Sequence, residues 1–198
     1  MNFFYFMVYV ILGPIFWLIF PCLFYGLKNI PKEGPLMVCA NHNAMRDPIF
    51  IAMAFGPVNQ LSFMVKAELF NIPVIGRLFK LAGMFPANRD NVDSQAIRTT
   101  ITLLKSGKKI MLFPEGARVE RNTRPPAKHG AVKVATKLDV PILPIYIFPA
   151  ERAFQFSRLV VGEPIRLKQP EDRNFDSISQ TLMDEIYSLE VYSRRRKS

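Results

Sequence analysis

Residues 35–50 read PLMVCANHNAMRDPIF, an apolar run followed by a polar turn and a second apolar run. The first run, 35–40, follows a Lys-Glu-Gly-Pro turn and has the length of a buried strand. Asp47 and Pro48 open a second apolar stretch to Phe55, which favours a helix with Asp47 as its N-cap and Pro48 in its first turn. The sequence therefore predicts a strand and a helix joined by a loop of polar side chains.

The same alternation continues along the chain. Further strands are expected at 61–66, 83–87, 109–113, 141–148 and 159–165, and further helices at 92–106, 130–138 and 176–192. Pro141 and Pro144 favour an edge or entry-loop position for their strand, because proline donates no backbone hydrogen bond. Strands that alternate with helices predict an α/β fold, with a mixed, mostly parallel sheet flanked by helices. Active sites of such folds lie in the loops beyond strand ends.

The first 27 residues contain no charged side chain. The run is long enough for one helical crossing of a bilayer, since about 20 apolar residues suffice. Pro14 and Pro21 each remove a helical hydrogen bond, so we expect the segment to cross while bent or to dip into one leaflet. A buried core helix is the alternative. The predicted organisation is a membrane-anchoring or interfacial helical segment at 1–27 and an α/β domain at 28–198.

The charge pattern bears on partners and location. Lys and Arg number 26 against 16 Asp and Glu, a net charge of +10, which implies an acidic partner. The chain has no basic stripe with stacking aromatics and no nucleic-acid module, so we expect an anionic membrane surface rather than nucleic acid. Lys28 and Lys32 follow the apolar segment and nothing basic precedes it, which predicts a cytoplasmic face of the cell membrane, of the bacterial inner-membrane type. With two cysteines, two histidines and no CxxC, we expect no metal site.

The polar loop after 35–40 contains His42 and, five residues on, Asp47. A tight loop can return this carboxylate to the imidazole, where it fixes the tautomer and leaves the other ring nitrogen as a general base. The alternative is that Asp47 only caps its helix and that His42 is an ordinary loop residue.

A second polar cluster, Phe113-Pro114-Glu115-Gly116-Ala117-Arg118, also follows a predicted strand. Gly116 lets the backbone approach a ligand, and Arg118 offers a planar fork that suits a phosphate. An ordinary turn with a solvated arginine is the alternative. A third cluster, Asn88-Arg89, follows the strand expected at 83–87.

Together these clusters resemble the motifs of PlsC-like lysophosphatidic acid acyltransferases over roughly residues 28–165. The matching positions are Asn41-His42 with Asp47; Lys66-Ala67-Glu68-Leu69, Pro73, Gly76, Gly83 and Arg89; Phe113 to Gly116 with Arg118; Lys128 and Gly130; and Val140 to Ile145. Ala44 and Ala117 stand where the family often has Ser and Thr. These two departures leave the identity of the acceptor open.

The resemblance implies a membrane-associated enzyme of phospholipid biosynthesis, with the glycerolipid acyltransferase fold. It would move a fatty acyl group from acyl-CoA or acyl carrier protein to the sn-2 hydroxyl of lysophosphatidic acid, giving phosphatidic acid. His42 would be the base and Asp47 would orient it. The acceptor phosphate would bind Lys66, Arg118 and Arg89, supported by Asn41, Glu115 and Gly116, without a metal or redox cofactor.

Two alternatives stay open at this point. The acceptor is glycerol-3-phosphate or a different lysolipid, or the chain is a non-catalytic membrane lipid-binding module. The intact His42 and Asp47 argue against the second alternative. Acyl-chain length, the choice of donor and the oligomeric state are not predicted.

Overall fold

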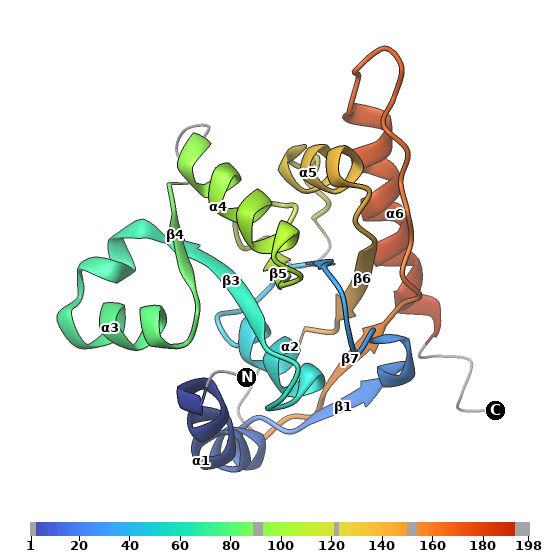
Figure 1. Cartoon of the computed structure of the whole chain (residues 1–198). Coiled ribbons are helices and arrows are strands. Elements are labelled where there is room, and N and C mark those ends of the chain that lie inside the picture. Colours follow the sequence, from blue (N-terminus) through green and yellow to red (C-terminus); the bar gives the residue numbers. More distant parts are fainter. Residues whose placement is uncertain (1–2, 89–92, 121–122, 150–153, 193–198) are drawn as a thin grey trace.

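The computed structural model describes residues 3–88, 93–120, 123–149 and 154–192 (Figure 1). Within them, seven strands form one sheet in the order β1-β7-β6-β2-β5-β3-β4. The strands are β1 Cys22–Tyr25, β2 Leu36–Ala40, β3 Leu61–Lys66, β4 Phe85–Ala87, β5 Lys109–Leu112, β6 Ile142–Ile147 and β7 Ser157–Val161. All neighbours pair in parallel except β6 and β7, which are antiparallel. The predicted mixed, mostly parallel sheet is confirmed.

Helices cover both faces of this sheet (Figure 1). They are α1 Phe3–Ile19, α2 Asp47–Phe55, α3 Pro73–Leu81, α4 Ser94–Lys105, α5 Gly130–Leu138 and α6 Asp176–Tyr192, with short 3-10 turns η1 Leu27–Asn29 and η2 Ala67–Asn71. The predicted helices that begin at 130 and 176 match α5 and α6 at both ends. Side chains of α1 and α2 pack on one face, and those of α4, α5 and α6 on the other.

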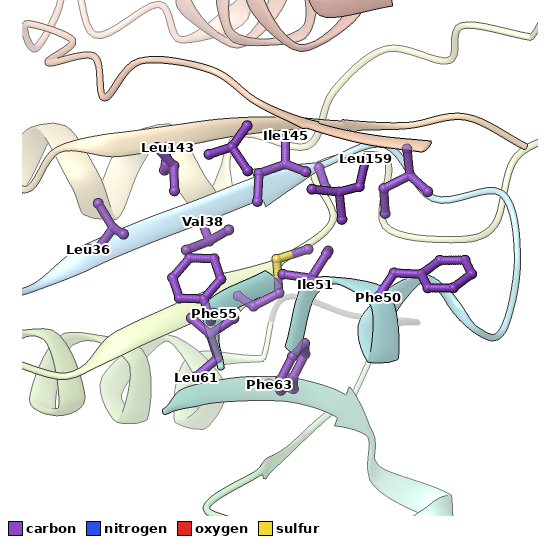
Figure 2. Close-up of a cluster of buried hydrophobic side chains, with 14 of the residues drawn as sticks. Leu36, Val38, Phe50, Ile51, Phe55, Leu61, Phe63, Leu143, Ile145 and Leu159 are labelled. Atoms are coloured by element: carbon purple, nitrogen blue, oxygen red, sulfur yellow. The ribbon is translucent and has the colours of Figure 1, made fainter. Parts of the chain in front are cut away.

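Strand β2 lies at the centre of the sheet, and all five of its residues are buried. Leu36, Val38 and Ala40 point into the core beneath α2, whereas Met37 and Cys39 point to the α4–α6 face. Figure 2 shows the first of these cores, with side chains of α2 against those of β2 and its neighbouring strands. Burial on both faces explains why the PLMVCA run has no polar residue.

The edge position expected for the proline-containing strand is wrong, because β6 lies between β2 and β7. Pro144 is tolerated there since its missing N–H faces β7 at a break in the ladder. The Pro144 carbonyl accepts from the Gly162 N–H at 2.9 Å, and regular pairing with β7 begins only at Ile145. Strand β7 ends at Val161, opposite Ile145, so the proline lies just beyond the paired part of β7 and interrupts no regular pair there.

The N-terminal segment also differs from the sequence-based expectation of one apolar helical unit through residue 27. Helix α1 ends at Ile19, and Cys22–Tyr25 forms the edge strand β1, parallel to β7. The carbonyls after Pro21 are therefore used by the sheet rather than by a second apolar helix. In the described part of the chain, no helix is long and apolar enough to span a membrane.

Helix α1 lies against the domain with one face and leaves the other uncovered. Tyr5 is buried, the Tyr9 hydroxyl donates to the Met53 carbonyl at 3.0 Å, and Phe16 and Phe20 pack on the core. Burial raises the pKa of Tyr5 to about 12. The opposite side is apolar and exposed at Phe3, Met7, Val10, Ile11, Leu12, Ile15, Trp17 and Leu18. The buried-helix alternative therefore describes only half of α1.

Helix α3 extends beyond the β4 edge and is held close to η2 by a glycine (Figure 1). A Cβ added at Gly76 would lie 2.1 Å from the carbonyl oxygen of Phe70. That contact is with backbone, so no side-chain rotation relieves it.

We expect Gly76→Ala to lower the free energy of unfolding by about 1–3 kcal/mol, because η2 and α3 must move apart. Gly130→Ala in the first turn of α5 is the matched control, since its Cβ would meet nothing within 4 Å. The control should be neutral or up to about 1 kcal/mol more stable, because alanine favours the helix. Denaturant unfolding of both variants tests the pair, and equal effects would contradict the close approach at Gly76.

Candidate active site

The polar loops identified in the sequence meet at the carboxyl edge of the parallel strands. The loop with His42 follows β2, the loop with Glu115 follows β5, and Lys66 ends β3. Because β2, β5 and β3 are adjacent and parallel, their following loops lie side by side.

His42 and Asp47 form a buried pair. The His42 Nδ1 lies 3.0 Å from Asp47 Oδ2, and the two residues are 6% and 2% exposed. The same oxygen accepts the backbone N–H groups of Asn43 and Ala44, each at 2.7 Å. A carboxylate only accepts, so Nδ1 carries the hydrogen and Nε2 keeps its lone pair.

The predicted capping role of Asp47 is wrong. Arg46 occupies the N-cap position of α2, and Asp47 is the first helical residue. Its carboxylate turns back into the preceding loop because three donors converge there. The structure thus brings His42 and Asp47 together and rejects the helix-cap alternative.

A stacked ring fixes the plane of the imidazole. The His42 ring lies on Phe113 with centroids 3.9 Å apart and planes 12° from parallel. Phe113 is part of the second sequence motif, yet no pattern in the sequence predicted this contact. Together with the Asp47 bond, the stack leaves the imidazole little rotational freedom.

Glu115 is a buried bridge between the loop at 41–46, which contains His42, and helix α6. Its Oε2 accepts the backbone N–H of His42 at 2.8 Å, and its Oε1 accepts the Tyr187 hydroxyl at 2.7 Å. Burial raises the pKa of Glu115, and the two hydrogen bonds oppose that rise. Burial and the adjacent Glu115 raise the pKa of Tyr187 as well. Tyr187 lies 72 residues from Glu115 in a plain amphipathic helix, so the sequence did not identify it.

Asn41 ties the loop to β6. Its side chain donates to the Ile147 carbonyl at 2.9 Å and accepts the Ile147 N–H at 2.7 Å. Asn43 donates to the same carbonyl at 3.3 Å. The His42 carbonyl in turn accepts the Val119 N–H at 2.8 Å. The residues flanking the imidazole are therefore fixed on both sides.

The backbone conformation and a close neighbour explain why position 116 is a glycine. Its φ of 77° lies in the left-handed region, and a Cβ there would come within 2.5 Å of the Lys128 Cε. The Lys128 N–H donates to the Pro114 carbonyl at 2.8 Å. Two separate sequence motifs thus meet at one turn.

The predicted phosphate ligands are placed less tightly. Lys66 is exposed at the end of β3, with its Nζ 3.1 Å from Glu68 Oε1, and Arg118 is exposed in the loop after β5. Within the described residues, no hydrogen bond joins either side chain to His42. Arg89 lies outside the described residues.

The comparisons with known proteins identify the family. A family model described as Acyltransferase matches residues 22–148. The chain belongs to the acyltransferase family. Among its relatives, the 1-acyl-sn-glycerol-3-phosphate acyltransferase of Bacillus subtilis is 29% identical over 175 residues, which cover 84% of this chain and 86% of the relative. The enzyme of the same name from Streptococcus pneumoniae is 29% identical over 182 residues, 87% of this chain and 67% of the relative.

A solved structure extends the likeness to the fold. The crystal structure of the 1-acyl-sn-glycerophosphate acyltransferase PlsC from Thermotoga maritima matches with a TM-score of 0.71 at 19% identity, covering 97% of this chain and 96% of that one. The predictions that the chain is an enzyme and belongs with the PlsC-like acyltransferases are confirmed.

The raised pKa of Glu115 gives a pH test of the bridge. Its carboxyl is more easily protonated in the folded than in the unfolded chain, so stability is lost as pH rises from the ordinary value of 4.5 through the folded pKa. Glu115→Gln cannot ionise; its amide oxygen can still accept the His42 N–H, and its NH₂ group can donate to the Tyr187 oxygen, which reverses the second bond. The variant's free energy of unfolding, relative to the unaltered protein, should therefore increase as pH rises above 4.5.

The measurement is denaturant unfolding at several pH values, with Glu163→Gln, which removes an exposed carboxylate, as the matched control. A difference that stays flat or decreases with pH for Glu115→Gln would contradict the assignment.

Proposed function

We propose that the chain transfers a fatty acyl group from a thioester, acyl-CoA or acyl carrier protein, to the sn-2 hydroxyl of lysophosphatidic acid, giving phosphatidic acid. The observation that carries the proposal is the buried His42–Asp47 pair, whose Nε2 is left with a lone pair. The names of the relatives supply the acceptor and product.

The chemistry follows from the position of the protons. His42 Nε2 takes the hydroxyl proton while the hydroxyl oxygen attacks the thioester carbonyl carbon. The new C–O bond forms, the C–S bond breaks, and the proton passes from His42 to the leaving sulfur. Asp47 holds the ring and stabilises the imidazolium formed in between.

Direct transfer, without an acyl-enzyme, fits the two cysteines. Burial raises the pKa of Cys22 to about 12 and also raises that of Cys39, so neither thiol readily forms the nucleophilic thiolate. The thioester arrives already activated, so the proposed reaction uses no metal or redox cofactor.

The acceptor phosphate is proposed to bind Lys66 and Arg118, with Arg89 as a third candidate. Lys66 and Arg118 extend from adjacent strands β3 and β5 at the carboxyl edge of the sheet, where exposed cations favour an anionic group.

We expect His42→Ala to reduce the rate of acyl transfer by about 10² to 10⁴, because a positioned base is lost. Asp47→Asn should be nearly as severe, since the neutral amide no longer fixes the tautomer or stabilises the imidazolium. The assay measures labelled acyl transfer from acyl-CoA to lysophosphatidic acid, with glycerol-3-phosphate and a different lysolipid as parallel acceptors. Near-normal turnover of folded His42→Ala protein would contradict the mechanism, and preference for another acceptor would replace lysophosphatidic acid.

The outer face of α1 is proposed to enter one leaflet of the membrane. The C-terminal end of α1 adjoins the catalytic loop, because the Arg46 guanidinium lies over the Phe20 ring at 5.2 Å and the Phe154 N–H donates to the Ile19 carbonyl at 2.8 Å. Leu18, Met45 and Phe154 are 69%, 71% and 70% exposed around this junction. Such an apolar rim next to the site suits substrates that reside in lipid.

The uncharged segment followed by Lys28 and Lys32 supports an orientation with the domain on the cytoplasmic face of the cell membrane. The basic surface would add attraction to anionic headgroups.

The structure dictates point substitutions rather than a deletion as the test of α1, because removing residues 1–27 would also remove β1 and the Phe16 and Phe20 contacts. Ile11→Glu with Leu18→Glu places two charges on the exposed face and should sharply weaken sedimentation with anionic vesicles. Val191→Glu on α6 is the matched control, since Val191 is also exposed. Unchanged binding of the double variant at high salt would exclude α1 as the anchor.

A further inference from the structure

A pocket of about 590 Å³ lies beside the catalytic loop, on the side of β6 and β7. Its lining is mostly polar and includes Asn43, Gln155, Arg124 and Arg158. The ring of Tyr187, whose hydroxyl binds Glu115, forms part of the wall. The pocket therefore shares three residues, Asn41, Asn43 and Tyr187, with the network that holds His42.

Two arginines in this pocket are held by aromatic rings. The Arg158 guanidinium lies 4.5 Å from the centre of the Phe148 ring, and that of Arg124 lies 4.4 Å from the centre of the Tyr187 ring. Contact with a ring face leaves the in-plane N–H donors available. Arg124 Nη2 is 4.0 Å from Glu190 Oε2, which is longer than a hydrogen bond. Arg158 is thus positioned to receive an anion, whereas an anion at Arg124 would compete with Glu190, which also lines the pocket.

Resting on the acyl transfer proposed above, we propose that this pocket binds the phosphopantetheine arm shared by acyl-CoA and acyl carrier protein. The arm carries a phosphate at one end, two amides along its length and the thioester at the other end. Arg124 and Arg158 match the phosphate, and the side-chain amides of Asn43 and Gln155 match the arm's amides. The volume is in the range of pockets for ligands of this size.

The position of the pocket separates the two substrates. In the sheet, β2 with His42 lies between β6 on the pocket side and β5 with β3 on the side of Arg118 and Lys66. Asn41 and Asn43, which flank His42 in the chain, both line the pocket, so the thioester end of the arm is directed to the imidazole and the phosphate end to the arginines. Donor and acceptor then approach His42 from opposite sides.

Steady-state kinetics with each substrate varied in turn tests the assignment. Arg158→Ala and Arg124→Ala should each raise the donor KM about tenfold or more, the worth of a charged hydrogen bond, and leave the acceptor KM unchanged. Arg118→Ala should do the reverse. Arg166→Ala, which removes an exposed ion pair with Asp139 before the start of β6, is the matched control and should change neither.

The two donors are assayed in parallel. An equal rise in KM for acyl-CoA and for acyl carrier protein supports binding of the phosphopantetheine arm in the pocket, because both donors carry it. A rise confined to one of them would overturn the assignment in favour of the nucleotide or the carrier surface. A rise in the acceptor KM, or no rise at all, would overturn it too. Arg158→Lys keeps the charge and the aliphatic stem, so it replaces Arg158→Ala if thermal unfolding shows that the alanine variant does not fold.

Direct binding separates this proposal from the proposed function. Calorimetry of CoA, with 4′-phosphopantetheine and pantetheine as competitors, requires no acceptor. The phosphate should strengthen competition about tenfold in the unaltered protein and little in Arg158→Ala or Arg124→Ala. Arginine-dependent binding without transfer to lysophosphatidic acid would refute the acceptor and support the pocket. If the protein transfers the acyl group but neither arginine substitution changes its affinity for CoA, the pocket assignment is refuted and the proposed function is not.

Discussion

A single buried oxygen, Asp47 Oδ2, organises the loop that contains His42. It accepts the imidazole N–H of His42 and two backbone N–H groups, and a buried carboxylate is stable only with such donors. The fold of the loop and the orientation of the His42 imidazole are therefore set by the same bonds. The four residues between His42 and Asp47 let the first residue of α2 reach back to the end of β2.

Outside this loop, long-range contacts give the site its rigidity. Glu115 joins the His42 backbone to α6, and Asn41 joins it to the end of β6. Each bond replaces water on a buried polar group, so losing one partner exposes the other to a desolvation cost. The match to the family model ends at residue 148, whereas Tyr187 contributes from beyond it. Part of what positions His42 thus comes from α6, a helix that contains none of the sequence motifs.

The sequence was most informative where apolar residues follow one regular pattern. The helices at 130–138 and 176–192 and the buried run before Asn41 follow from apolar spacing alone. It failed at Pro144, because a central strand tolerates a proline where its neighbour ends, and the sequence does not show that β7 ends at Val161, opposite Ile145. It also failed at Cys22–Tyr25, because an apolar edge strand within an uncharged run cannot be distinguished by composition from a continuation of the preceding helix. Tyr187 and the Phe113 stack depend on tertiary approach, for which the sequence has no local signal.

Only Phe20 and Pro21 separate the end of α1 from the start of β1, and this has a mechanical consequence. The short linker and the packing of Phe16 and Phe20 on the core restrict rotation of the helix relative to the sheet. On the proposed membrane surface, the carboxyl edge of the sheet would be kept at a constant height and tilt above the lipid. The search for acceptor would then be a lateral one in two dimensions, and the bilayer itself would limit which hydroxyls reach the imidazole.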